Sequence, residues 1–224
     1  VLLVGAALPL MLAAGASSAA VTWGTWSNTF SPGPKTGTAT ETIGAVTASY
    51  TGDVRSVIAN FPSFTPTSSF VGPGVPNAPP QTGGILELTG GPQTRTETIT
   101  FSSPVTDPVL AIWSLGSAKT NAEFVFTQNE PFSLVAGGPS TEHGGGTLTL
   151  IPNGVAGMEG NGTLVFKGTY SSLTFTNPER ENWYGFTLGI NGAVPEPATW
   201  AMMILGMSML GGVMRSRRAG QAIA

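Results

Sequence analysis

The sequence is poor in the residues on which much enzyme chemistry depends. It has 224 residues with no cysteine and a single histidine, which excludes disulfide bridges, thiolate metal sites, a cysteine nucleophile and any site that needs two imidazoles. Charged residues make up 9% of the chain, against about 25% in an average soluble domain. The net charge of -3 provides no basic surface for a phosphate backbone, which argues against a nucleic-acid partner.

Glycine, proline and hydrophobic residues are abundant instead. The chain holds 31 glycines and 18 prolines, well above average usage, so turns must be frequent. Hydrophobic residues reach 41%, and two long hydrophobic runs lie at the two ends of the chain. At this length, one domain of ordinary size is expected between those ends.

The first twenty residues are typical of a secretory signal peptide. They carry no charge, are hydrophobic from Leu2 to Leu12, and then turn to alanine, glycine and serine, like the apolar and cleavage regions of such a signal. The basic leading region and the initial methionine are missing, so we predict a signal peptide at 1–20 that is truncated at its start. Cleavage after Ala20 leaves Val21 as the first mature residue, with alternative sites slightly earlier. A buried helix of the fold is the other interpretation.

A second uncharged stretch, residues 198–214, is followed at once by Arg215, Arg217 and Arg218. As a helix with a rise of 1.5 Å per residue it would be about 26 Å long, just enough to cross the hydrocarbon core of a bilayer. The arginines then act as a cytoplasmic basic stop, which places the tail at 219–224 in the cytoplasm and everything before the helix across the membrane. The sequence therefore predicts a transmembrane helix over 198–214.

Just before this stretch stand Pro195, Glu196 and Pro197, followed after two residues by Trp200 and Ala201. With the apolar stretch and the arginines, this order resembles the PEP-CTERM sorting signal in its PEPxxWA subclass, over residues 193–218. The resemblance implies that an exosortase, a membrane transpeptidase of Gram-negative bacteria that make exopolysaccharide, recognises Pro-Glu-Pro and removes the helix. The two prolines also keep the motif extended and accessible. A plain membrane anchor behind a Pro-rich linker is the alternative.

Between the two ends, residues 21–192 read as a series of short strands. Polar residues, often threonine, alternate with leucine or phenylalanine in runs separated by Gly, Pro, Asn and Ser, as in strands with one buried face. So many strands exceed one open sheet, which predicts an all-β domain, an antiparallel two-sheet β-sandwich of jelly-roll type, in preference to a closed barrel. The predicted strands are 38–50, 85–88, 96–101, 109–115, 123–127, 132–135, 147–150, 163–166, 172–176 and 185–190.

The inward-facing residues of these strands define a candidate core. Each large side chain buried there contributes about 1.5 to 3 kcal/mol, so the core can hold the domain without cross-links. The run from Pro108 to Trp113 is apolar throughout, which predicts a strand at the centre of the domain. The predicted core consists of Ile99, Phe101, Leu110, Ile112, Phe124, Phe126, Leu148, Leu150, Leu164, Phe166, Leu173, Phe175, Phe186, Leu188 and Ile190.

One long segment, residues 59–84, contains six prolines and no strand-like alternation. Loops of this length are usually functional or disordered. We interpret the segment as a surface loop that covers the domain. The alternative is that Phe61, Phe64 and Phe70 help to form a ligand groove.

The domain offers few residues for catalysis. His143, beside a run of three glycines, is the single imidazole, so a Ser-His-acid triad would have to use it. No Gly-x-Ser-x-Gly elbow supplies a nucleophile, and we interpret His143 as a solvated loop residue. A glycosidase would need two carboxylates, and the candidates are Glu123, Glu130, Glu179 and Glu181. Solvated charges explain these acids more simply, and we predict no enzyme.

Metal ions have little to bind in this sequence. Its two aspartates, Asp53 and Asp107, form no Asp-rich loop of the kind that binds calcium. A calcium site built from carboxylates and backbone carbonyls stays open, but no ligands are proposed. We predict no cofactor and no metal residue.

Aromatic residues give the strongest indication of binding. Trp183 and Tyr184 follow a polar segment rich in amides and carboxylates, and flat rings beside such groups suit the faces and hydroxyls of a sugar. These two residues are therefore candidate ligand-binding residues. Trp23 and Trp26 form a second aromatic group near the mature N-terminus. Packing at the edge of the core is the alternative for all four.

Together these patterns predict an exported protein of the cell envelope, outer surface or extracellular matrix of a Gram-negative bacterium. Its predicted partners are an exosortase and, before processing, the membrane through the C-terminal helix. An exopolysaccharide, as in a biofilm, is a further candidate partner. The β-sandwich has a structural or adhesive role. The alternative function is that of an extracellular carbohydrate-binding module.

Overall fold

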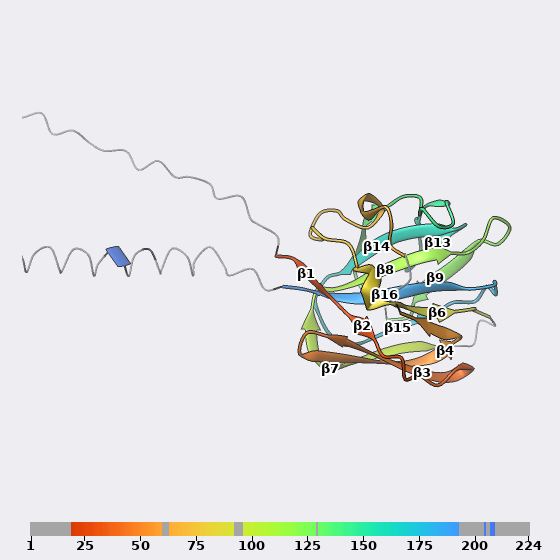
Figure 1. The fold of residues 1–224 in the computed structure, drawn as a ribbon, viewed down its shortest axis with the longest axis horizontal. Helices are drawn as coiled ribbons and strands as arrows, with labels where there is room; N and C mark the ends of the chain where they lie inside the picture. Colours follow the sequence, from red (N-terminus) through yellow and green to blue (C-terminus); the bar gives the residue numbers. More distant parts are fainter. Residues whose placement is uncertain are drawn as a thin grey trace, which may run out of the picture.

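The computed structural model describes residues 19–59, 63–91, 96–128 and 130–192, together with Ile204, Met207 and Ser208. Its strands form two sheets of eight strands each, which face one another as a sandwich (Figure 1). One short strand pair, β11 with β14, is parallel, and the other pairs of named strands are antiparallel. The predicted all-β, two-sheet sandwich is confirmed.

The two sheets divide the strands as follows. Sheet A has the order β10 (Phe132–Gly137), β14 (Gly160–Phe166), β8 (Pro108–Leu115), β16 (Tyr184–Asn191), β6 (Ile85–Leu88) and β5 (Ser56–Ile58), with β1 (Val21–Trp23) on β16 and β11 (Gly146–Thr147) on β14. Sheet B has the order β12 (Thr149–Ile151), β13 (Gly154–Gly157), β9 (Ala122–Phe126), β15 (Thr169–Thr176), β7 (Glu97–Thr106), β4 (Val46–Val54), β3 (Gly33–Ile43) and β2 (Thr25–Trp26). Two short 3₁₀ turns, η1 (Thr67–Ser69) and η2 (Gln81–Gly83), lie between β5 and β6.

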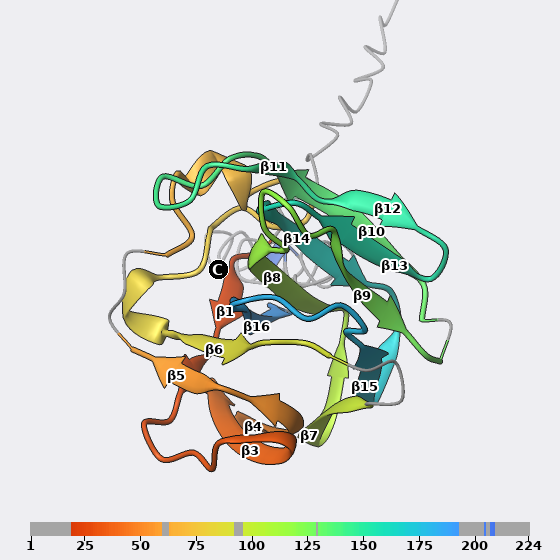
Figure 2. The same cartoon turned by 90° about the vertical axis from the view of Figure 1, so that its right-hand side faces the viewer.

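A nested pairing connects the middle of the chain. Strand β7 pairs with β15, β8 with β14, and β9 with β13. Because β7, β8 and β9 alternate between the sheets, their partners must alternate too. The segment from β7 to β15 is therefore one long hairpin wound across both sheets, which Figure 2 shows from the side.

The alternating sequence pattern sets the inner face of sheet B. In β3, Ala39 and Ile43 are buried in the main core, whereas the intervening threonines are exposed. The same rule holds along β15, where Leu173 and Phe175 are buried. Threonine suits the wet face because its branched side chain favours strands and its hydroxyl keeps contact with water.

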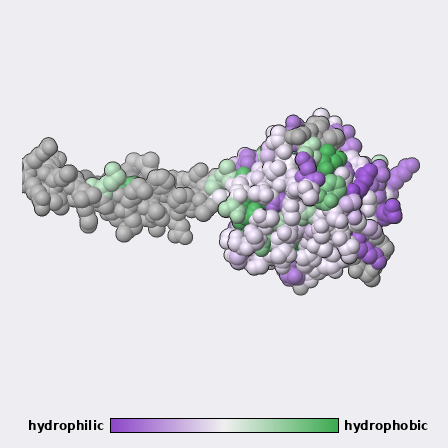
Figure 3. Space-filling model, turned by 60° about the horizontal axis from the view of Figure 1, so that its bottom comes forward, coloured by the Kyte–Doolittle hydropathy of each residue, from purple (hydrophilic) through white to green (hydrophobic). Residues whose placement is uncertain are grey.

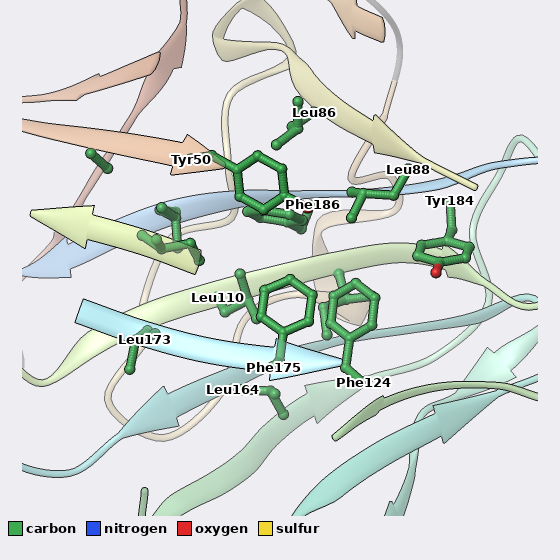
Figure 4. Packing of buried hydrophobic residues seen from close by; sticks show 14 of the residues in the cluster. Tyr50, Leu86, Leu88, Leu110, Phe124, Leu164, Leu173, Phe175, Tyr184 and Phe186 are labelled. Atoms are coloured by element: carbon green, nitrogen blue, oxygen red, sulfur yellow. The ribbon is translucent and has the colours of Figure 1, made fainter. Parts of the chain in front are cut away.

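The predicted core is largely confirmed (Figure 4). All of its members except Leu150 and Ile190 belong to the main core cluster, and Ile190 packs against that cluster while partly buried. The prediction that Leu150 belongs to the core is wrong, because this residue is 60% exposed. The predicted strand at 147–150 is in fact two strands: β11 belongs to sheet A and β12 to sheet B. The chain crosses between the sheets at Leu148, so residues two apart no longer share a face.

The predicted strand at 38–50 is also two strands. β3 and β4 meet in a tight turn at Gly44 and Ala45, where Gly44 has a φ of 58°. A residue without a Cβ adopts this left-handed conformation at little cost. The described residues form sixteen strands where the sequence predicts about ten, since several strands are too short to show alternation.

Sheet A is covered on its outer face by the long loop between β5 and β6. Phe64, Phe70 and Val75 of this segment, which we call the covering loop, are buried against outward-facing residues such as Trp113 and Val109 of β8. This explains why β8 is apolar throughout, since both of its faces are buried. The covering interpretation is confirmed. The alternative prediction of a ligand groove lined by Phe64 and Phe70 is wrong, because both side chains are buried. Phe61, its third residue, lies outside the described residues.

A buried carboxyl group joins the two sheets. Glu41 of β3 accepts hydrogen bonds from Thr187 Oγ1 (2.6 Å) and from the Leu188 N–H (3.2 Å to Oε2), both on β16. At Leu188, β16 passes from its pairing with β6 to its pairing with β1, and its carbonyl accepts from the Gly24 N–H at 2.9 Å. Glu41 therefore replaces a missing strand partner. Burial raises its pKa to about 8, although the two hydrogen bonds act in the opposite direction.

The described body begins and finishes at the same place. Val21 of β1 pairs with Asn191 of β16, so the first and last strands of the sandwich end side by side (Figure 1). Asn77 of the covering loop fixes this junction, since its side chain accepts from the Val21 N–H at 2.8 Å and donates to the Val21 carbonyl at 3.0 Å.

Figure 3 shows a face of mostly intermediate hydropathy, with hydrophilic residues gathered in a few places. This agrees with the low charge content and with strands whose wet faces carry threonine and serine.

The predicted signal peptide and the predicted transmembrane helix lie almost entirely outside the described residues. The signal peptide at 1–20 lies outside the described residues except for its last two. Of the predicted helix at 198–214, only Ile204, Met207 and Ser208 are described, and they are helical. In the part of the chain that the structure describes, no helix has the length and hydrophobicity needed to cross a membrane.

Candidate functional site

A pocket of about 240 Å³ lies at the end of the sandwich where β8 finishes and β16 begins. Trp113, near the end of β8, is opposite Gly185, near the start of β16. Four connecting segments, between β8 and β9, β10 and β11, β13 and β14, and β15 and β16, meet here. The lining residues are Ser114, Ser117, His143, Glu159, Glu181, Asn182 and Trp183.

The aromatic wall of the pocket consists of two lining rings, His143 and Trp183, which pack against a third, buried ring, Trp113. The ring of His143 stands edge-on to Trp113, with centroids 5.1 Å apart, and to Trp183, at 5.2 Å. The two indoles are themselves 5.1 Å apart. Trp113 is fully buried beneath the other two, whereas Trp183 is partly exposed. The wall is thus anchored in the outer face of sheet A.

The single histidine is exposed, as the sequence predicts for a loop residue. Its loop is held by contacts that the sequence does not reveal. The Ser140 and Gly144 backbones bond to each other in both directions, at 2.7 and 3.0 Å. Thr65 of the covering loop accepts from the Thr141 N–H at 2.8 Å and donates through Oγ1 to the Glu142 carboxylate. The covering loop therefore helps to hold His143 against the indoles.

A fully buried amide, Asn161, connects three of the pocket segments. Its Oδ1 accepts from the Ser114 N–H at 2.8 Å, and its Nδ2 donates to the carbonyls of Glu159 (2.9 Å) and Gly144 (3.2 Å). Hydrogen bonds to buried amides are costly to leave unmade. Asn161 thus fixes the relative positions of three segments, those that carry Ser114, Glu159 and His143.

Two carboxylates face the pocket, and each has one oxygen occupied by a protein donor. Glu159 Oε2 accepts from Ser114 Oγ at 2.5 Å, and Glu181 Oε1 accepts from the Trp183 N–H at 3.0 Å. Burial raises the pKa of Glu181 to about 7 against the effect of the Trp183 hydrogen bond, with a further increase from Glu159 and a decrease from Arg55. Among the described residues, the pocket lining contains two carboxylates and no lysine or arginine, so these residues give it a negative charge.

Two lining residues have left-handed backbone conformations. Ser114 has a φ of 57° and Glu159 a φ of 56°. Such conformations are uncommon for residues with a Cβ and cost of order 1–3 kcal/mol each. Phe64, Asp107 and Asn153, which are outside the lining, also have positive φ angles.

Two arrangements that the sequence left open, a serine activated by the histidine and a metal site, can be compared with this geometry. Ser114 donates to Glu159, so it is not positioned as a nucleophile activated by His143. Among the residues with described side chains, no three His, Asp or Glu side chains lie together as a metal site would need. Asp53 instead accepts from the Thr89 and Gly90 N–H groups, at 2.6 and 2.7 Å, and stabilises a turn.

The structure separates the four candidate aromatic residues. Trp183 lines the pocket. Tyr184, the next residue, points to the other side of its strand and is fully buried in the main core, so it offers no ring face to a ligand. Trp26 is buried in the same core, and Trp23 is partly buried with its Nε1 donating to the Asn77 carbonyl at 2.9 Å. Of the four candidates, Trp183 is therefore the one whose ring could contact a ligand in this pocket.

Of the four candidate glutamates, Glu181 alone lines the pocket. Its neighbour there is Glu159, which the sequence does not single out. Glu159 lies in a turn between Gly157 and Gly160, a context in which an acid reads as a solvated charge. Ser114, which also lines the pocket, and Trp113, against which the two lining rings pack, belong to the buried strand β8. The hydrophobicity of this strand does not indicate which of its residues lies at the pocket.

The sorting motif follows β16 directly in the sequence. Pro195, Glu196, Pro197, Trp200 and Ala201 lie outside the described residues, as do Arg215, Arg217 and Arg218. Comparison with known families finds a PEP-CTERM protein-sorting motif at residues 193–218. None of the curated proteins or solved structures matches the chain.

Proposed function

Because the chain carries a C-terminal PEP-CTERM protein-sorting motif, which implies an exported protein processed by an exosortase and sorted to the cell surface, we propose that its β-sandwich has a structural or adhesive role there. The site of action is the envelope or the exopolysaccharide matrix of a Gram-negative biofilm. The observation that carries the proposal is the pairing of Val21 with Asn191. Because Asn191 precedes the sorting motif in the sequence by two residues, the end of the sandwich that holds Val21 and Asn191 would face the membrane.

The pocket lies at the other end. β16 runs from Tyr184 beside the pocket to Asn191 beside β1, and at about 3.3 Å per residue its length is about 25 Å. A body held at the Asn191 end would therefore present the pocket outward. An outward pocket favours a role in contact with external material.

Mass spectrometry of the mature protein tests the sorting step. In cells with an exosortase, we expect a surface species that lacks the residues beyond about Pro197. Replacing Glu196 by alanine should abolish this processing, whereas Thr199→Ala, at a variable position of the motif, should leave it intact. A surface species whose mass still includes Arg215 to Arg218 would contradict the proposal.

The adhesive role has its own test. A strain that lacks the gene should release more of its matrix polysaccharide, or adhere less, than the parent strain. Complementation with the intact chain should restore adhesion, and complementation with Glu196→Ala should not. Equal adhesion in all strains would leave the protein sorted but without this role.

The strand order supports the jelly-roll type within the sandwich class. In such folds a long hairpin is wound so that consecutive strands alternate between two sheets. The nested pairs of β7 with β15, β8 with β14 and β9 with β13 have this arrangement. We therefore retain the jelly-roll assignment for the body.

Carbohydrate binding is the second candidate function, and the position of Trp183 favours it. A partly exposed indole beside Asn182 and two carboxylates combines a flat apolar face with hydrogen-bonding groups, as sugar sites do. A glycan array with the full chain should detect binding that Trp183→Ala abolishes. Leu150→Ala, at an exposed position of β12, is the control. Binding that survives the loss of Trp183 would remove this pocket as the site.

A further inference from the structure

We propose that the pocket binds an organic ammonium group, carried by an amino sugar whose amine is free. The inference deepens the carbohydrate-binding candidate and rests on it, since it names the class of sugar that the pocket would select. It is argued from the charge, the aromatic wall, the free acceptors and the size of the pocket.

The charge of the lining favours a cation. Glu159 and Glu181 both line the pocket, and no lysine or arginine from residues 19–59, 63–91, 96–128 and 130–192 does. Two carboxylates that face one small space repel each other, and a positive ligand between them removes that repulsion. A neutral sugar gives no such gain, and an anionic one would add a third negative charge.

The hydrogen-bonding groups are suited to an ammonium donor. Ser114 Oγ occupies one oxygen of Glu159, and the Trp183 N–H occupies one oxygen of Glu181. Within the described part of the chain, no donor is bonded to the second oxygen of either carboxylate. An ammonium group has three N–H donors and no acceptor, so it can satisfy both free oxygens at once.

The aromatic wall supplies the remaining contact. Trp183 and His143 stand 5.2 Å apart over the buried Trp113. An indole face attracts a nearby cation through its quadrupole and also packs against the C–H face of a sugar ring. Because Trp183 is held between Trp113 and His143, its orientation is fixed before a ligand arrives.

The size of the pocket limits the ligand to one small unit. Sites for drug-sized ligands have about 300–1,000 Å³, and this pocket has about 240 Å³. That space fits one sugar ring, with any further rings of a polymer outside. A free amine on the enclosed ring would then lie between the carboxylates.

The test measures binding to the full chain, purified in mild detergent, by tryptophan fluorescence and calorimetry. The probes are a glucosamine tetramer, its N-acetylated counterpart, a neutral glucose tetramer and methylammonium, which keeps three N–H donors. We expect the glucosamine tetramer to bind at least about tenfold more tightly than the other two sugars, because a charge-assisted hydrogen bond is roughly twice as strong as a neutral one. Glu159→Gln should remove this preference, and Glu123→Gln, on β9 outside the pocket, should keep it.

Each result separates the inference from the function on which it rests. Equal binding of all three tetramers would overturn the selection of an amine and leave carbohydrate binding in place. Binding of methylammonium without any sugar would support an ammonium site and overturn an amino sugar as its source. Binding of none of the probes would overturn both. If Glu159→Gln fails to fold, Glu181→Gln gives the same test, since it removes the charge of the other carboxylate that lines the pocket.

Discussion

Replacing Glu41 by glutamine should remove a large dependence of stability on pH. The Glu41 carboxyl is enclosed between β3 and β16 and has a pKa raised from 4.5 to about 8, chiefly by burial. Glutamine has nearly the same shape, carries no charge at any pH, and can accept the same hydrogen bonds from Thr187 and Leu188. The variant should therefore resemble the protonated wild type.

The magnitude follows from the difference between the folded and unfolded pKa values. Since the folded pKa of Glu41 is raised, the folded state holds a proton that the unfolded chain releases. The stabilisation is complete below about pH 4.5 and is lost progressively as the pH rises towards about 8. At about 1.4 kcal/mol for each pKa unit, the loss over this window is about 5 kcal/mol, which is comparable to the whole stability of many domains.

Urea denaturation of residues 21–192, which contain every described core residue, measures this effect. Unfolding should be followed by circular dichroism at several pH values from 4.5 to 8.5. The wild type and Glu41→Gln should be similar at pH 4.5, and the variant should be more stable by several kcal/mol at pH 8.5. Glu123→Gln serves as a control for the general loss of a carboxylate. Parallel pH profiles for the wild type and Glu41→Gln would refute the reasoning, because Glu41 would then be ionised in the folded protein.

Three further substitutions test the packing described above. Phe70→Ala in the covering loop should cost about 3–5 kcal/mol of unfolding free energy by urea denaturation, whereas Leu150→Ala, at an exposed position, should change it by no more than about 0.5 kcal/mol; equal losses would contradict the burial of the loop. Asn77→Ala removes two hydrogen bonds to β1 and should speed amide exchange at the start of that strand, with a loss of about 1–3 kcal/mol. Gly24→Ala would place a Cβ on the Glu41 carboxyl and should cost about 1–3 kcal/mol, and Glu41→Ala in the same chain should relieve that loss.

Local patterning predicts most of this fold. Threonine alternating with leucine or phenylalanine identifies strands such as β15 and the inner face of the sandwich, because the same two-residue period governs side-chain direction and burial. The pattern fails at Leu150, since nothing in the local sequence marks the point where the chain passes from sheet A to sheet B. It also fails at Glu41, an acid at a core position whose partners on β16 are more than a hundred residues away.

The candidate site is predicted much less well. Trp183 can be singled out by its own neighbours, but its contacts with Trp113 and His143 depend on loops that are distant in the sequence. Asn161 brings these loops together through hydrogen bonds to backbone groups. Because every residue has such backbone groups, the sequence does not show which of them Asn161 binds. A pocket formed in this way can be identified only from the folded structure.

Because Val21 and Asn191 are adjacent, the sandwich is suited to circular permutation and to insertion into other proteins. A short linker could close these neighbouring positions into a continuous chain, and new termini could be opened at the tight turn between β3 and β4. Such circular permutants are tolerated where chain ends lie close together at the surface. By the same geometry, the whole body could be inserted into a surface loop of an unrelated host protein without stretching either partner.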